Sequence, residues 1–252
     1  MSTDVILRTE DLTKSFKGFT AVSSVNLAVG RGTIHALLGP NGAGKTTIFN
    51  LLTKTIAPTD GRIWYKDRDI TALKPADVAR LGMVRSFQIS AVFLELTVLQ
   101  NVRVALQRFR GDSYYFWRSS RVLHELDDRA KALLAEVGLD SFADRKASEL
   151  AYGHRRALEV ATTLALDPEL LLLDEPMSGL GQADIPRISA LIRNSAAKRT
   201  ILMVEHNLPV VADLCNHITV LARGAVIADG SYAEVSRDPA VKEAYMGAQH
   251  YA

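Results

Sequence analysis

The feature that most constrains the fold of this chain is a glycine-rich segment that runs into a lysine and two threonines at residues 39–47. It matches the pattern G-x-x-x-x-G-K-[ST], with an apolar run at residues 34–38 that predicts a strand before it and a helix-like run at residues 46–52 after it. The glycines permit a tight turn whose N–H groups point into one concavity, and the helix N-terminus adds to the attraction for phosphate. An ordinary glycine turn is the alternative, but it would match by chance in only about one chain in a hundred of this length.

The segment therefore predicts a nucleotide phosphate site that contains Gly39, Pro40, Asn41, Gly42, Ala43, Gly44, Lys45, Thr46 and Thr47. In such a site we expect Lys45 to reach the terminal phosphates and the hydroxyl of Thr46 to hold Mg²⁺.

Composition excludes several classes of protein. The 252 residues are 48% apolar and 23% charged, which is typical of a globular chain with a sizeable core. A net charge of +2 argues against a protein that coats nucleic acid. The single cysteine, Cys215, excludes an internal disulfide framework and fits a reducing compartment. The first residues lack the layout of a signal peptide, and no apolar run approaches a membrane span, so we expect any membrane role to act through a partner.

The hydrophobic pattern predicts an α/β fold with a mostly parallel core sheet. Short alternating segments at residues 5–7, 21–29 and 62–65 predict an N-terminal antiparallel β layer around the nucleotide loop. Residues 97–138 have a helical pattern and predict an inserted α-helical subdomain. Within it, residues 108–118 mix basic and aromatic side chains, which favours local packing or a protein partner over nucleic-acid binding.

Acidic and histidine residues follow two further apolar runs. Residues 170–173 lead into Asp174 and Glu175, and residues 200–204 lead into Glu205 and His206. Continuous apolar runs indicate parallel strands buried on both faces, and ligands collect at the carboxyl ends of such strands. The alternatives are a helix or turn cap for the acidic pair and a plain strand-end polar residue for His206.

Placed beside a phosphate loop, these side chains predict an ATPase site. We expect Asp174 to hold Mg²⁺ and Glu175 to orient or deprotonate the attacking water. We expect His206 to sense the γ-phosphate.

Residues 150–159, which read LAYGHRRALE, resemble the signature stretch of ATP-binding-cassette ATPases. The order of the phosphate loop, Gln88, the signature, Asp174–Glu175 and His206 is also that of the family, and the likeness extends over about residues 5 to 247. The resemblance implies the ABC-ATPase variant of the P-loop NTPase fold, with ATP and Mg²⁺ as ligands. It implies that Gln88 contacts Mg²⁺ or the attacking water, and that Phe16 stacks on adenine.

The resemblance also implies that the active unit is a dimer. The signature residues Ala151, Tyr152, Gly153 and His154 would cover the γ-phosphate bound by a second ATPase subunit, identical or different. The loop at residues 178–181 would link the two sites. The family usually has serine at Ala151, glutamine at His154 and, in many members, aspartate at Gly181. The missing hydroxyl at Ala151 predicts weakened closure, since a hydrogen bond to a charged group contributes roughly 1.5–3 kcal/mol.

Within this family, the chain is similar to the subunits that energise uptake of branched-chain amino acids. The Leu-x-Tyr-Gly signature, the residues around Gln88, the insertion at residues 108–123 and the ending at residues 238–247 carry this likeness. It implies membrane permease subunits as partners, an indirect link to a periplasmic or extracellular solute-binding protein, and a place at the cytoplasmic face of the inner membrane. Systems for amides, urea or lipopolysaccharide share parts of the pattern and stay open as alternatives.

The expected organisation is a single nucleotide-binding domain over residues 1–252. Its core and β subdomain would comprise residues 5–90 and 168–230, its helical signature subdomain residues 91–167, and its C-terminal helices residues 231–252. A soluble cassette acting on nucleic acid or the ribosome is a second class, but those relatives usually carry two cassettes or coiled-coil arms. A P-loop kinase is a third class, and it would leave the signature and His206 without a role.

Overall fold

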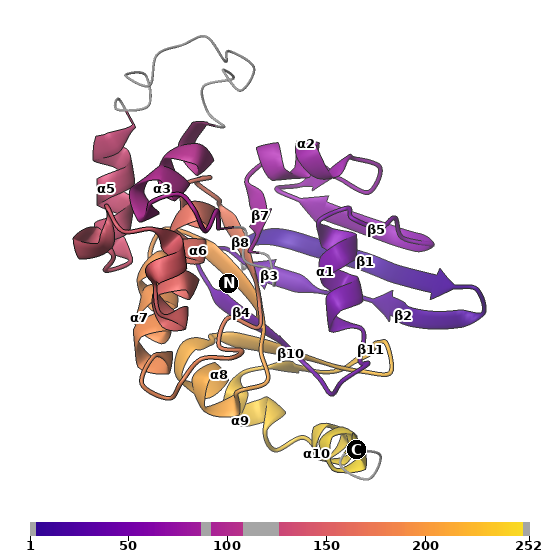
Figure 1. Ribbon diagram of the computed structural model, residues 1–252. Coiled ribbons are helices and arrows are strands. Elements are labelled where there is room, and N and C mark those ends of the chain that lie inside the picture. Colours follow the sequence, from indigo (N-terminus) through magenta and orange to yellow (C-terminus); the bar gives the residue numbers. More distant parts are fainter. Residues whose placement is uncertain (1–3, 87–91, 108–125, 249–252) are drawn as a thin grey trace. The chain divides into compact units, whose positions relative to one another are not determined.

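The computed structural model describes residues 4–86, 92–107 and 126–248. The chain forms two compact units (Figure 1). The first unit comprises Met1–Arg85, Glu169–Pro176 and Arg193–Ala252, and the second comprises Ser86–Pro168 and Met177–Ile192. Gln88 and the insertion at residues 108–123 lie outside the described residues. Among the residues that are described, no helix is long and apolar enough to cross a bilayer.

The first unit contains both sheets and the helices that connect their strands. Its strands are β1 (Val5–Phe16), β2 (Phe19–Val25), β3 (Ala28–Gly30), β4 (Ile34–Leu38), β5 (Asp60–Tyr65), β6 (Arg68–Asp69), β7 (Met83–Arg85), β8 (Leu170–Asp174), β9 (Thr200–Val204), β10 (His217–Ala222) and β11 (Ala225–Gly230). Its helices are α1 (Lys45–Leu52), α2 (Pro75–Arg80), α8 (Leu208–Leu214), α9 (Tyr232–Val235) and α10 (Pro239–Ala248).

The larger sheet is mostly parallel, as the apolar runs predict. Its strand order is β11-β10-β4-β9-β8-β7, and β11 pairs antiparallel with β10 while each other neighbouring pair is parallel. Every residue of β4, β8 and β9 is buried, which explains why these segments are apolar throughout rather than alternating. The carboxyl ends of the three strands therefore lie along one edge of the sheet.

The smaller sheet is antiparallel, with the order β2-β1-β5-β6 and with β3 paired to β1. The prediction of a short strand at residues 5–7 and one strand at residues 21–29 was wrong in detail. β1 continues to Phe16 because Asp11, at φ 47°, introduces a register shift that lets the two halves of β1 pair with different partners. The side chain of Asn26 accepts a hydrogen bond from the Asp11 backbone N–H at 2.9 Å, and this contact separates β2 from β3.

The core of the first unit joins the two sheets through α1. Ile48, Phe49, Leu51 and Leu52 of α1 are fully buried in a cluster with side chains from β1, β2 and β5 of one sheet and β4, β8 and β9 of the other. Each fully buried side chain of this kind contributes roughly 1.5–3 kcal/mol. The helix that follows the glycine-rich loop is therefore held on both sides, and its first turn has a fixed position.

The second unit is helical. It contains α3 (Val98–Leu106), α5 (Asp127–Glu136), α6 (Tyr152–Leu164) and the 3₁₀ turns η2 (Asp140–Phe142) and η3 (Ala147–Glu149), together with the larger part of α7 (Ile185–Ala196). α3, α5 and α6 pack against one another through apolar faces. Thr97 and Gln100 form a capping box at the start of α3, which satisfies backbone N–H groups at this helix end.

Candidate nucleotide-binding site

The loop between β4 and α1 depends on glycines whose backbone other residues rarely adopt. Gly39, Gly42 and Gly44 have φ values of 148°, 78° and 103°. A Cβ atom at Gly39 would overlap the carbonyl oxygen of Leu221 in β10, and one at Gly44 would lie 2.7 Å from the carbonyl oxygen of Ala21. The loop is therefore pressed between two strands, which leaves space for backbone alone at these two positions.

This arrangement predicts different effects for two alanine substitutions in the loop. Gly39→Ala combines overlap with backbone strain, so we expect it to lower the free energy of unfolding by about 3 kcal/mol. Gly42→Ala is the matched control, because its Cβ would meet nothing within 4 Å and only strain of about 1 kcal/mol applies. Chemical denaturation of both variants measures the difference. Equal loss of stability would show that the packing of Gly39 against β10 is unimportant.

Lys45, the first residue of α1, folds back over the loop. Its ammonium group donates to the carbonyl oxygens of Gly39 at 2.6 Å and Pro40 at 2.9 Å. Burial lowers the pKa of Lys45, and the negative charges of Glu175 and Asp174 act in the opposite direction. The structure thus brings the loop lysine within electrostatic reach of the acidic pair. The adjacent Thr46 is exposed.

Asp174 and Glu175 lie at the carboxyl end of β8, beside the end of β9. Asp174 pairs with Val204 in the sheet, and the N–H of Glu175 donates to the carbonyl oxygen of Val204 at 2.9 Å. The Asp174 side chain is 1% exposed, whereas Glu175 is half-buried and has the left-handed φ of 45°. Because a left-handed non-glycine residue is strained, this backbone conformation costs about 1–3 kcal/mol.

Glu205 and His206 differ sharply in exposure. One carboxylate oxygen of Glu205 accepts hydrogen bonds from the backbone N–H groups of His206 at 2.8 Å and Asn207 at 2.9 Å. Glu205 is fully buried, while the side chain of His206 is 66% exposed. Glu205 therefore shapes the turn after β9, and the imidazole of His206 extends into solvent at the same sheet edge as the loop and Asp174.

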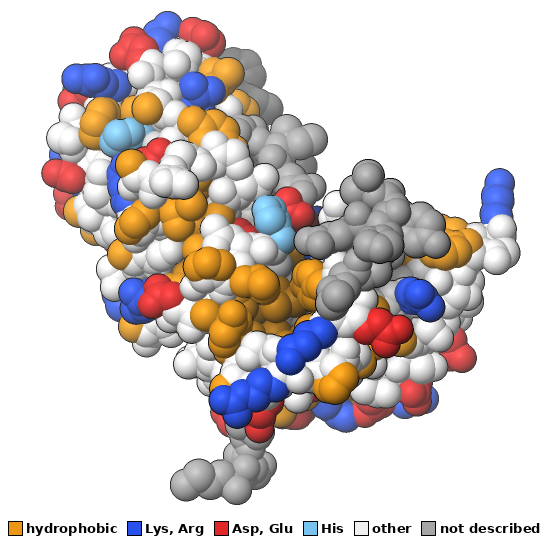
Figure 2. Space-filling view, turned by 90° about the horizontal axis from the view of Figure 1, so that it is seen from below, with side chains coloured by type: hydrophobic (Ala, Val, Ile, Leu, Met, Phe, Trp, Pro, Cys, Tyr) orange, Lys and Arg blue, Asp and Glu red, His pale blue; other side chains and the backbone are white. Residues whose placement is uncertain are grey.

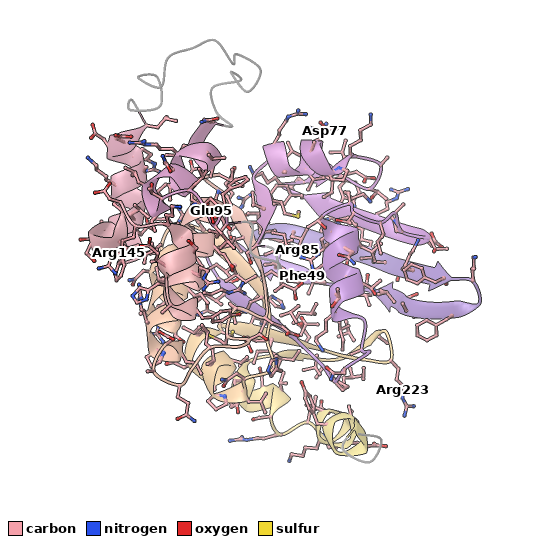
Figure 3. The ribbon with its side chains drawn as sticks, viewed as in Figure 1. Phe49, Asp77, Arg85, Glu95, Arg145 and Arg223 are labelled. Atoms are coloured by element: carbon pink, nitrogen blue, oxygen red, sulfur yellow. The ribbon has the colours of Figure 1, made fainter. Side chains whose placement is uncertain are left out.

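Arg85 is a site residue whose contacts the sequence analysis missed. It is the last residue of β7, and its guanidinium forms an ion pair with Asp174 and donates to the side-chain oxygen of Asn50 at 2.6 Å. It also lies 5.5 Å from the ring centre of Phe49, which Figure 3 labels beside it. Its place as a polar residue at the carboxyl end of an apolar strand was the signal that could have marked it as a candidate.

Phe16 and Tyr245 are two further aromatic residues of the first unit that have defined contacts. Phe16, at the end of β1, is 45% exposed, and the Lys14 ammonium lies 5.0 Å from its ring centre. Phe19, its cross-strand partner, is more exposed still. At the C-terminal end of the chain, Tyr245 of α10 is hydrogen-bonded to the backbone of Gly39, and burial raises the pKa of this tyrosine. The sequence analysis named Phe16 as a nucleotide-binding residue and did not name Phe19 or Tyr245.

The four signature residues lie in the second unit, at the start of α6. Ala151 is the N-cap and provides no side-chain cap, and the hydroxyl of Tyr152 donates to the carbonyl oxygen of Ser178 at 3.2 Å. A Cβ atom at Gly153 would overlap the carboxylate of Asp184, so glycine allows this acid to approach the helix. The ring of His154 lies 4.6 Å from that of Phe142.

These contacts of the signature residues are therefore all with other residues of the second unit. Burial lowers the pKa of His154, with Arg187 acting in the same direction and Asp184 opposing it. Gly181 has open space around it, so an aspartate would fit at this position. The loop at residues 178–181 contacts the signature through Tyr152.

Oxygen ligands of the kind that Mg²⁺ prefers are present in the first unit. Thr46, which is exposed, and the carboxylate of Asp174 provide them. Asp174 also forms an ion pair with Arg85, so the guanidinium compensates the charge of this carboxylate. The donor set fits a magnesium ion bound with a nucleotide.

Charged side chains of both signs are interspersed over the face shown in Figure 2, in keeping with the small net charge.

Comparison with known proteins gives consistent matches. A family model described as ABC transporter matches residues 22–178, and one described as branched-chain amino acid ATP-binding cassette transporter matches residues 225–251. The chain is 38% identical over 252 residues to the high-affinity branched-chain amino acid transport ATP-binding protein BraF of Pseudomonas aeruginosa, with 96% of this chain and 98% of that protein covered. It is 37% identical over 249 residues to LivG of Escherichia coli, with the same coverage.

Solved structures resemble this fold closely. An ATP-binding cassette of an ABC transporter in its ADP conformation has a TM-score of 0.85 at 30% identity and covers 97% of this chain and 100% of that chain. A nucleotide-free ATP-binding cassette from an ABC transporter has a TM-score of 0.83 at 29% identity, with 96% and 98% covered.

Proposed function

Because this chain belongs to the ABC transporter family, we propose that it is the ATP-binding and ATP-hydrolysing subunit of an importer for branched-chain amino acids. One observation carries the catalytic part: the glycine-rich loop, Asp174–Glu175 and Glu205–His206 follow three neighbouring parallel strands. The names of the relatives and the match at residues 225–251 support branched-chain amino acids over amides, urea or lipopolysaccharide as the solute.

ATP binding uses the loop and the first turn of α1. The N–H groups of residues 39–47 and the ammonium of Lys45 receive the phosphates, so Lys45 exchanges its carbonyl partners for phosphate oxygens. The exposed ring of Phe16 stacks on the adenine.

Thr46, Asp174 and Gln88 would hold Mg²⁺, and Gln88 lies outside the described residues. When bound, the ion neutralises charge that develops on the phosphate oxygens. Glu175 orients and deprotonates the attacking water, because its half-buried carboxylate follows the metal ligand Asp174 by one residue. His206 contacts the γ-phosphate through its exposed imidazole.

The signature residues Ala151, Tyr152, Gly153 and His154 act on the nucleotide of a second ATPase subunit. The N-terminus of α6 offers backbone N–H groups to the γ-phosphate there, and Ala151 adds no hydroxyl. ATP therefore favours the closed dimer because both subunits bind its γ-phosphate, and hydrolysis releases it. The partner is an identical chain or a related one.

The subunit works at the cytoplasmic face of the membrane by docking on permease subunits, which receive solute from a binding protein on the other side. In this proposal residues 5–90 and 168–230 form the core with its β subdomain, residues 91–167 the signature subdomain and residues 231–252 the C-terminal helices of one nucleotide-binding domain.

Uptake by cells that lack this chain tests the solute. We expect uptake of labelled leucine, isoleucine and valine to fall to the background level, since transport without ATP hydrolysis cannot concentrate the solute. The wild-type chain should restore it, and Lys45→Ala, which removes the phosphate-binding ammonium, should not. Urea and short-chain amide uptake serve as controls. Unchanged leucine uptake together with lost urea or amide uptake would replace the proposed solute while leaving the ATPase intact.

A further inference from the structure

Two histidines and an aspartate converge in the first unit at a place that the nucleotide site does not use. His35 belongs to β4, His217 begins β10, and Asp229 lies in β11, so three adjacent strands contribute one side chain each. One ligand atom from each of the three side chains lies within 4.8 Å of the other two. The rings of His35 and His217 are 4.9 Å apart between centres.

A hydroxyl between these side chains determines which nitrogen of His35 carries the proton. Thr219 donates its single hydroxyl proton to a carboxylate oxygen of Asp229. The same hydroxyl is 2.8 Å from Nε2 of His35, so it must accept a hydrogen bond from that nitrogen. Neutral His35 is therefore protonated on Nε2, and its Nδ1 keeps a lone pair.

That lone pair is an unused ligand. Nδ1 of His35 is buried and has no hydrogen-bond partner among the described residues. A buried acceptor without a donor is unfavourable and needs an explanation, such as a missing ion.

We propose that His35, His217 and Asp229 bind one divalent transition-metal ion of the zinc class. Two imidazoles and one carboxylate suit Zn²⁺ or Co²⁺, whereas Mg²⁺ prefers oxygen ligands alone. The Nε2–H of His35, held by Thr219, is the outer hydrogen bond that metal-bound histidines commonly make, and the same hydroxyl orients Asp229.

The surroundings allow an ion to enter and the ligands to close around it. His35 is fully buried, while the side chains of His217 and Asp229 are 39% and 52% exposed. Ligands of a tetrahedral zinc stand about 3.3 Å apart, so the partly exposed side chains of His217 and Asp229 would move towards His35 on binding. Nε2 of His217 now lies 2.8 Å from Asp229, and the ion replaces the proton between them.

The site would join β4, β10 and β11 at the end of the sheet remote from the loop. β4 continues directly into Gly39, and β10 carries the carbonyl of Leu221 that packs on that glycine. The ion has a structural role, since none of its ligands takes part in the proposed ATP chemistry. Its test is therefore independent of the proposed function.

Zinc titration of the full chain, freed of metal by a chelator and without nucleotide, tests this site. We expect one equivalent of Zn²⁺ by calorimetry and a Tm that rises with zinc concentration. His217→Ala and Asp229→Asn change exposed rim ligands, so they should fold normally and bind zinc at least about tenfold more weakly. His206→Ala, which removes an exposed histidine elsewhere, is the matched control and should bind as the wild type does.

Cobalt gives a readout that needs no variant. Co²⁺ bound by two imidazoles and a carboxylate in tetrahedral geometry absorbs visible light strongly, and added Zn²⁺ should abolish that absorption. Absence of this spectrum in the wild-type chain, or equal zinc affinity in the wild type, His217→Ala and Asp229→Asn, would overturn the proposal. The cluster would then be a hydrogen-bonded network that works without an ion.

Discussion

Glu175→Gln should lower the rate of ATP hydrolysis by roughly 10²- to 10⁴-fold, the usual contribution of a general base. Gln has the shape of Glu and can occupy the same left-handed backbone, whose N–H is held by Val204, but it cannot accept the proton of the attacking water. ATP binding should persist because Lys45 and the loop are unchanged. The variant should therefore accumulate as an ATP-bound dimer, which size exclusion with ATP present would detect.

Glu169→Gln is the matched control for this experiment. Glu169 directly precedes β8, at the opposite end of the strand from Glu175, and its half-exposed carboxylate forms ion pairs with Lys66 and Arg31. The Glu169→Gln variant should hydrolyse ATP at close to the wild-type rate. A Glu175→Gln variant that hydrolyses ATP like this control, or stays monomeric with ATP, would contradict the role of Glu175.

Arg85→Met should destabilise the nucleotide-free chain by about 3 kcal/mol, because removing one partner of a buried ion pair leaves the other charge poorly compensated. Asp174 is 1% exposed, and Arg85 also connects it to Asn50 of α1. Chemical denaturation measures the loss. Arg80→Met is the control, since its ion pair with Asp77 is exposed and should contribute less than about 1 kcal/mol.

A double variant separates the charge pair from packing on Phe49. In the background of Asp174→Asn, which removes the carboxylate charge, Arg85→Met should cost much less than in the wild type. Mg²⁺ with ATP should also stabilise Arg85→Met more than the wild type, because the ion supplies the missing positive charge beside Asp174. Equal losses in both backgrounds would mean that Arg85 acts through its contacts with Asn50 and Phe49 and not through the charge of Asp174.

Much of the site was predictable because its signals are local. The loop at residues 39–47 requires three closely spaced glycines, a lysine and a threonine, and these lie within nine residues of the chain. The burial of β8 and β9 on both faces follows from their composition, and the polar residues after them mark the strand ends. The family resemblance extended this reading to the ABC transporter family, which the comparisons confirm.

Long-range contacts were not predictable in the same way. Arg85 and Asp174 are separated by 89 residues and meet only because β7 lies beside β8. The extension of β1 depends on Asp11. Its left-handed conformation accompanies the register shift that allows β1 to pair with both β2 and β5. Such contacts depend on strand order, which single segments do not encode.

The sequence by itself determined the chemistry of this protein: a phosphate loop before a helix, an acidic pair after an apolar strand, and the family to which that combination belongs. The tertiary structure alone decided which side chains meet. It brings Arg85 and Asp174 into an ion pair and places His35, His217 and Asp229 close together. The physical reason is that periodicity and composition report on each segment's own burial. Contacts between these segments arise only when the fold places their strands side by side in the sheet.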